Sequence, residues 1–137
     1  MADSQKRMSI RELSQLYFLN REIEREKRRL ADLEAAATGI TANIKGLPHI
    51  GTVSDKTAIA AEIADCKAVI EAKVKASIAE YNRLNRYIAT VNDSLMREIL
   101  TLRFVEGLSW EDVAYNIGGK NTPDSVRMLC NRFLRKK

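Results

Sequence analysis

The segment "NTPDSVRMLCNRFLRKK" (121–137) holds the side chains best suited to bind another molecule. Arg127 carries two donors that match guanine O6 and N7, and Asn131 can pair with adenine in a similar bidentate way. Asp124 can accept a hydrogen bond from cytosine N4. Because these residues are spaced by three and four positions, they fall on one side of a helix. Their types and spacing are typical of a helix that reads base edges in the DNA major groove.

The same segment is basic. Residues 122–137 carry five basic residues against the single acid Asp124, a net charge of +4, whereas residues 92–121 have a net charge of −2. Cations gathered on one helix attract DNA phosphates, although they could also only solvate the C-terminus and complement the helix dipole. The predicted DNA-binding residues are Asp124, Ser125, Arg127, Met128, Asn131, Arg132, Arg135, Lys136 and Lys137.

Three short helices are expected to position this face. The first lies within residues 93–107 and ends at Gly107, a residue type favoured after a helix C-terminus. The second follows Ser109 as its N-cap, with Trp110, Val113, Ala114 and Ile117 as its buried face. Gly118 and Gly119 then permit a turn with positive φ. Asn121 or Thr122 caps the last helix, with Pro123 in its first position.

Two longer helices are expected before residue 92, over residues 9–37 and 55–91. Ser9 with Glu12 predicts a capping box, and Ser54 is a candidate N-cap for the second helix. The second helix has an apolar three-four repeat typical of a coiled coil. Neither helix can bury its apolar stripe alone, so an antiparallel hairpin is expected, and a homodimer would cover what remains. The predicted assembly residues are Ile63, Ile70, Leu84 and Ile88.

The predicted fold class is therefore all-α: a long, coiled-coil-like antiparallel helical hairpin followed by a C-terminal three-helix helix-turn-helix module. The boundary is expected between residues 91 and 92. Residues 1–91 would form the assembly module, with a glycine- and proline-containing loop at 38–54, and residues 92–137 the DNA-binding module.

The amino-acid composition limits the classes of protein to which this chain could belong. The 137 residues are 30% charged and 45% hydrophobic with a net charge of +5, which fits a folded protein with a polyanionic partner. Cys66 and Cys130 are expected to be reduced core thiols. No apolar run is long enough for a membrane span and no signal peptide is evident, so a cytoplasmic protein is expected. No catalytic constellation, phosphate loop or metal-ligand cluster is recognised, so neither enzymatic activity nor a cofactor is expected.

The sequence "LMREILTLRFVEGLSWEDVAYNIGGKNTPDSVRMLCNRFLRK" (95–136) resembles region 4 of sigma-70-type factors. That resemblance implies a helix-turn-helix with base contacts on Pro123, Asp124, Arg127 and Met128. Pro123 and Met128 depart from the polar residues usual there, so a −35 promoter element is not the expected target. The matching residues are Leu100, Arg103, Phe104, Gly107, Leu108, Ser109, Asp112, Val113, Ala114, Thr122, Val126 and Arg127.

With its N-terminal hairpin and the "GLPHIGTVSDK" segment (46–56), the whole chain resembles the ArpU/RinA-like regulators of phage late genes. The resemblance implies a transcriptional activator in a bacterial host cell that binds double-stranded DNA, with RNA polymerase as a candidate partner. Two alternatives remain open. One is a DNA-packaging protein similar to a terminase small subunit, and the other is a coiled-coil adaptor that does not bind DNA.

Overall fold

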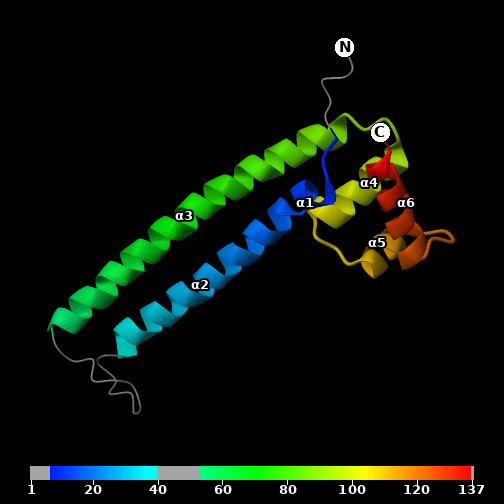
Figure 1. The fold of residues 1–137 in the computed structure, drawn as a ribbon. Coiled ribbons are helices and arrows are strands. Elements are labelled where there is room, and N and C mark those ends of the chain that lie inside the picture. Colours follow the sequence, from blue (N-terminus) through cyan, green and yellow to red (C-terminus); the bar gives the residue numbers. More distant parts are fainter. Residues whose placement is uncertain (1–6, 40–52, 137) are drawn as a thin grey trace. The chain divides into compact units, whose positions relative to one another are not determined.

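The computed structural model describes residues 7–39 and 53–136, and in these residues the chain is helical with no strand (Figure 1). The prediction of an all-α fold is confirmed. The elements are α1 (Ile10–Leu13), α2 (Gln15–Gly39), α3 (Val53–Ala89), α4 (Ser94–Leu100), the π-helical turn η2 (Thr101–Val105), α5 (Trp110–Ile117) and α6 (Pro123–Arg135). Most of the loop expected at 38–54 lies outside the described residues.

The described residues divide into two compact units. Unit 1 combines residues 7–18 with residues 77–136, and unit 2 combines residues 19–39 with residues 53–76. Unit 1 therefore contains α1, the ends of both long helices and every element after α3. This division differs from the expected boundary at 91/92, because the two chain ends share one hydrophobic core.

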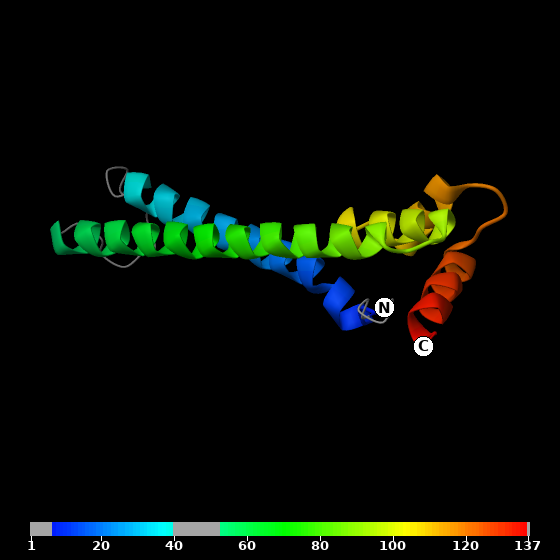
Figure 2. The ribbon, with the colours of Figure 1, turned by 90° about the horizontal axis from the view of Figure 1, so that it is seen from above.

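In unit 2, α2 and α3 run antiparallel, and α3 appears as one unbroken helix in Figure 2. Lys73 Nζ lies 2.6 Å from Glu22 Oε1, while Arg29 and Glu62 lie within 3.9 Å of each other further along the pair. Residues later in α2 thus meet residues earlier in α3. The hydrogen bond from Lys73 holds the pKa of the Glu22 carboxyl below its usual range.

Apolar burial in unit 2 is sparse. Among its described residues only Ile23 and Cys66 belong to the buried core. The Cys66 thiol donates to the Glu26 backbone carbonyl at 3.4 Å, so this cysteine is the buried, unbridged thiol that the sequence predicts. In the part of α3 that belongs to unit 2, the other apolar stripe positions Ile59, Ile63 and Ile70 are only half-buried.

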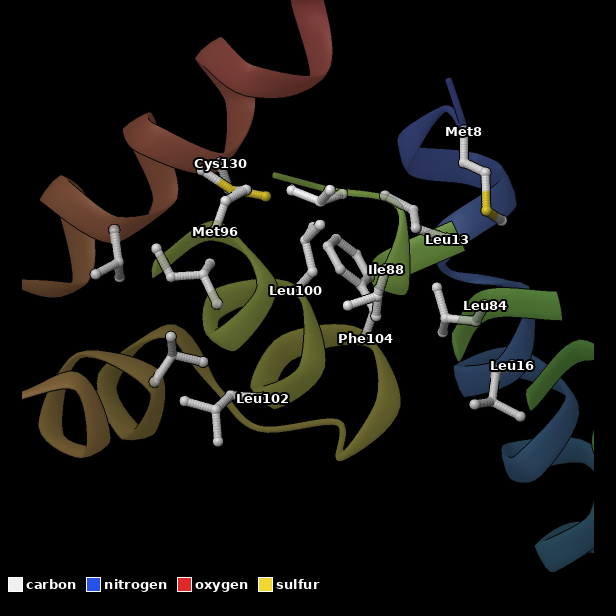
Figure 3. Close-up of a cluster of buried hydrophobic side chains, with 14 of the residues drawn as sticks. Met8, Leu13, Leu16, Leu84, Ile88, Met96, Leu100, Leu102, Phe104 and Cys130 are labelled. Atoms are coloured by element: carbon white, nitrogen blue, oxygen red, sulfur yellow. The ribbon is translucent and has the colours of Figure 1, made fainter. Parts of the chain in front are cut away.

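The core of unit 1 joins segments that are far apart in the sequence (Figure 3). Leu13 of α1 and Ile88 of α3 lie beside Leu100 and Phe104, and Cys130 of α6 lies beside Met96. Fully buried side chains come from each part: Leu13, Leu84, Ile99, Leu100, Val113, Val126 and Cys130. Burying such side chains stabilises a fold by about 1.5–3 kcal/mol each, so this core fixes where α6 lies within unit 1.

The predicted capping residues can be compared with the observed ends of the helices. The capping box of Ser9 and Glu12 is confirmed, with both hydrogen bonds at 3.0–3.1 Å. The expected continuous first helix is interrupted at Ser14, where ψ is −6°. The prediction of Ser54 as an N-cap is wrong, since α3 begins at Val53 and takes Ser54 into its first turn. Asp93 is the N-cap of α4, and its side chain accepts from the Leu95 N–H at 3.0 Å.

The sequence pattern did not predict η2. After α4 the backbone widens into a π-helical turn, and the Glu106 N–H donates to the Thr101 carbonyl at 2.9 Å. Gly107 follows with φ +73°, the conformation expected of a glycine that ends a helix. Turns of this kind insert one residue into a helix and re-aim the side chains that follow.

A matched pair of substitutions in α1 tests the shared core. Leu13→Ala removes a fully buried side chain and should lower the free energy of unfolding by about 2–5 kcal/mol. Ile10→Ala, in the same helix but at a side chain that is 51% exposed, should lower it by much less. Guanidinium unfolding followed by the fluorescence of Trp110, the single tryptophan, reports on unit 1 directly. Equal effects of the two substitutions would contradict this core.

Candidate nucleic-acid interface

The start of α6 is defined by its own side chains. Of the two candidate caps, Thr122 is the N-cap, and Pro123 occupies the first turn as predicted. Thr122 Oγ1 accepts from the Ser125 backbone N–H at 3.0 Å, while Ser125 Oγ accepts from the Thr122 N–H at 2.8 Å. This reciprocal box satisfies two otherwise unpaired donors. Ser125 is therefore a half-buried capping residue, not an outward-facing one as expected.

The connection from α5 to α6 depends on two glycines. Ser109 caps α5 by accepting from the Asp112 N–H at 3.2 Å, as predicted. At the other end Gly118 has φ +80° and Gly119 has φ +66°, so both residues of the predicted turn have positive φ. The Asn121 amide donates to the Gly118 carbonyl at 2.9 Å and closes the turn. Helix α5 then packs mainly against α6, with Val113 and Ala114 buried.

Helix α6 presents a basic face to solvent. Its exposed side chains include Arg132, Arg135 and Lys136 near the C-terminal end and Asp124, Arg127 and Met128 near the N-terminal end. The opposite stripe is buried at Val126 and Cys130 and partly buried at Leu129 and Phe133. The predicted residue Lys137 lies outside the described residues.

The acidic and basic side chains at the start of α6 are paired. Arg127 Nη2 lies 3.3 Å from Asp124 Oδ1, and both side chains are largely exposed. An exposed pair of this kind contributes little to stability. Breaking this pair would therefore cost little free energy, which leaves both groups available to other hydrogen-bond partners.

Asn131 is not on the most exposed side of α6. It is half-buried and, together with Arg127, lines a groove with a cavity volume of about 450 Å³. Ile10 of α1, Tyr17 and Phe18 of α2, and Trp110 of α5 also line this groove. The predicted reading face is therefore split, because Asp124 and Met128 face open solvent while Asn131 faces this groove.

The groove contains residues whose role the sequence did not indicate. The Arg103 guanidinium lies 4.6 Å from the centroid of the Trp110 ring and donates to the Leu108 carbonyl at 2.9 Å. Tyr17 and Phe18 stack edge to face with ring centroids 5.3 Å apart. Arg103 matches the sigma pattern, but its stacking depends on η2 and on the loop that follows, and periodicity cannot reveal either.

Chemical reactivity in this region is low. Burial raises the pKa of the Cys130 thiol to about 11, so the thiol stays protonated near neutral pH and is a poor nucleophile. Among the described residues there is no group of three or more His, Cys, Asp or Glu side chains that could hold a metal ion. The surface can bind through hydrogen bonds and charge, which is what contact with a polyanion needs.

The predicted assembly residues separate into two environments. Ile63 and Ile70 belong to unit 2, where they are half-buried on α3. Leu84 and Ile88 belong to the buried core of unit 1, together with Leu13 and Leu100. Leu84 and Ile88 therefore stabilise the unit that carries α6.

No helix in the described ranges is long and apolar enough to cross a bilayer. Comparison of the chain with protein-family models, with curated proteins and with solved structures gives no match.

The two glycines of the turn should respond differently to substitution. Gly118 combines φ +80° with ψ −164°, a region open almost only to glycine, and an added Cβ would meet no atom within 4 Å. Gly118→Ala should therefore lower the free energy of unfolding by about 1–3 kcal/mol through backbone strain alone. Gly119 has φ +66°, a value that Asn tolerates better than most residues, so Gly119→Asn should cost less than Gly118→Ala. Denaturant unfolding of both variants tests this, and equal losses would contradict it.

Proposed function

We propose that this chain is a sequence-specific DNA-binding transcriptional regulator, with α5, the turn at 118–122 and α6 as its helix-turn-helix. One observation carries the proposal: a well-capped helix presents an exposed, acid-poor basic face beside a glycine-specified turn. A helix of this size fits the major groove of B-DNA. In such an arrangement the second helix reads the bases while the first crosses the backbone.

The charge distribution along α6 supports different roles for its two ends. Asp124, Arg127 and Met128 occupy its first turns and would meet base edges. Arg132, Arg135 and Lys136 cluster at the other end, where sequence-independent contacts to phosphate would supply much of the affinity. Asp124 repels phosphate and so disfavours docking in a wrong register.

The resemblance to ArpU/RinA-like regulators extends the proposal to a biological setting. The protein would act in the cytoplasm of a bacterial host as an activator of phage or prophage late genes, with RNA polymerase as its partner in transcription. The match to the sigma pattern between Leu100 and Arg127 supports this setting, and the helical N-terminal half agrees with it.

Incomplete burial in unit 2 supports homodimerisation. Ile63 and Ile70 remain half-buried, and Val69 on the same helix is 39% exposed. A second copy that packs along this coiled-coil-like stripe would remove that apolar surface from water.

The two alternatives differ in their partners. A terminase small-subunit-like protein would assemble into a ring and bind a packaging ATPase. An adaptor without a DNA role would show no salt-sensitive DNA binding. Mapping of bound genomic sites, together with the identity of the co-purifying proteins, separates all three.

Arg127 gives the sharpest test of base reading. A lost bidentate contact should cost about 1–3 kcal/mol and relax the preference at a single base position. Arg127→Ala and the parent chain should each be selected against a randomised duplex library, with Arg135→Ala as the control for a phosphate contact. The control should weaken binding to all sequences alike. An identical motif for Arg127→Ala and parent, with only a lower affinity, would refute base reading by Arg127.

Ile70 tests assembly without disturbing the core of unit 1. In a dimer Ile70→Asp would bury an unpaired charge, which costs several kcal/mol and should yield a helical monomer. Ala68→Asp adds the same charge at an exposed position of α3 and should remain a dimer. Light scattering gives the mass and circular dichroism the helicity. A monomeric parent chain at high micromolar concentration would contradict the dimer.

A further inference from the structure

The segment that precedes α1 contacts the far end of α6. Arg7 Nη1 donates to the Phe133 carbonyl at 2.9 Å, across 126 positions of sequence, and also to the Lys136 carbonyl. Its guanidinium lies over the Phe133 ring, 5.4 Å from the centroid. Carbonyls in the last turn of a helix have no intrahelical partner. Arg7 therefore caps α6 at the end that carries the basic residues.

Helix α1 continues along the same part of α6. Ser9 and Ile10 line a cavity of about 390 Å³ together with Asn131, Leu134 and Arg135. Two buried side chains, Met8 and Leu13, anchor this segment in the core of unit 1. Core packing thus holds residues 7–13 beside the C-terminal half of α6.

This segment adds positive charge where α6 is already most basic. Arg7 lies against the end of α6, and Arg11 is exposed on α1 one residue after Ile10. Within residues 7–13 the one acid is Glu12, which is held by two donors: the Ser9 backbone N–H at 3.0 Å and Arg83 Nη2 at 2.7 Å. Those contacts hold the pKa of the Glu12 carboxyl below its usual range and direct its charge toward Arg83.

We infer that Arg7 and Arg11 extend the phosphate-binding surface of α6 onto α1, so that the DNA backbone is held by two elements from opposite ends of the chain. This inference rests on the proposed function. Each cation that neutralises a phosphate releases about 0.9 of a counterion, so two such residues should account for nearly 2 units of the slope of log affinity against log salt concentration.

The exposed Arg11 provides the cleanest test, because its removal leaves the cap on α6 intact. Binding of the full-length chain to one duplex is measured between about 50 and 200 mM salt. Arg11→Ala should flatten the salt slope by about 1 unit, so its loss of affinity between about 50 and 200 mM salt should be roughly fourfold smaller than that of the parent chain. Arg28→Ala removes the same charge from an exposed position of α2 in unit 2 and should leave the slope unchanged.

Arg7 is tested by two variants, because it also caps α6. Arg7→Lys keeps the charge and should retain the parent slope with a lower melting temperature. Arg7→Ala should lose about 1 unit of slope as well. A parent slope that persists in Arg11→Ala, or an equal loss in Arg28→Ala, overturns the inference while the proposed function stands. A parent chain that binds duplex DNA without salt dependence refutes the proposed function itself.

Discussion

Burial of one hydrophobic core between the two ends of the chain is the constraint on which the rest of the structure depends. Helix α6 has thirteen residues, and a helix that short is marginal in water. It persists because Val126 and Cys130 are buried in a core that also contains Leu13 and Ile88, contributed by α1 and by the last turns of α3. A substitution in α1 therefore acts on α6 through packing, although more than a hundred residues separate them. The position of the surface proposed to bind DNA therefore depends on this shared core.

Hydrogen bonds at its two ends complete the definition of α6. Thr122 and Ser125 satisfy donors at its start, and Arg7 satisfies carbonyls at its end. These two caps have different origins. The first is encoded within four consecutive residues, whereas the second exists only because the core brings residues 7 and 133 together. The exposed face between the caps then carries charge without being needed for packing. Substitutions on this face should therefore change the free energy of unfolding only slightly.

Unit 2 is held together differently. Its ion pairs are mostly exposed, and pairs of that kind contribute about 0–1 kcal/mol each. Apolar burial is concentrated at Ile23 and Cys66, far less than in unit 1. Because these two long helices share so little buried core, covering their half-buried apolar stripe would stabilise them further. In the proposed dimer, the stability of unit 2 and association would depend on the same residues, Ile63 and Ile70.

The sequence by itself determined the helical class and most of the helix ends, because caps and glycine turns act over three or four residues. Ser9 with Glu12, Asp93, Ser109, Thr122 and the two glycines at 118–119 lie where those local rules predict. Burial along α6 at Val126 and Cys130 also followed from periodicity alone. Only the tertiary structure decided which apolar helix stripes pack against one another. It placed Leu84 and Ile88 in the core of unit 1 and Asn131 at a groove. It also stacked Arg103, which lies within the π-helical turn that the sequence did not predict, on Trp110, and placed Arg7 at the end of α6. Contacts between distant segments depend on how all the apolar stripes are buried at once, and no local pattern contains that information.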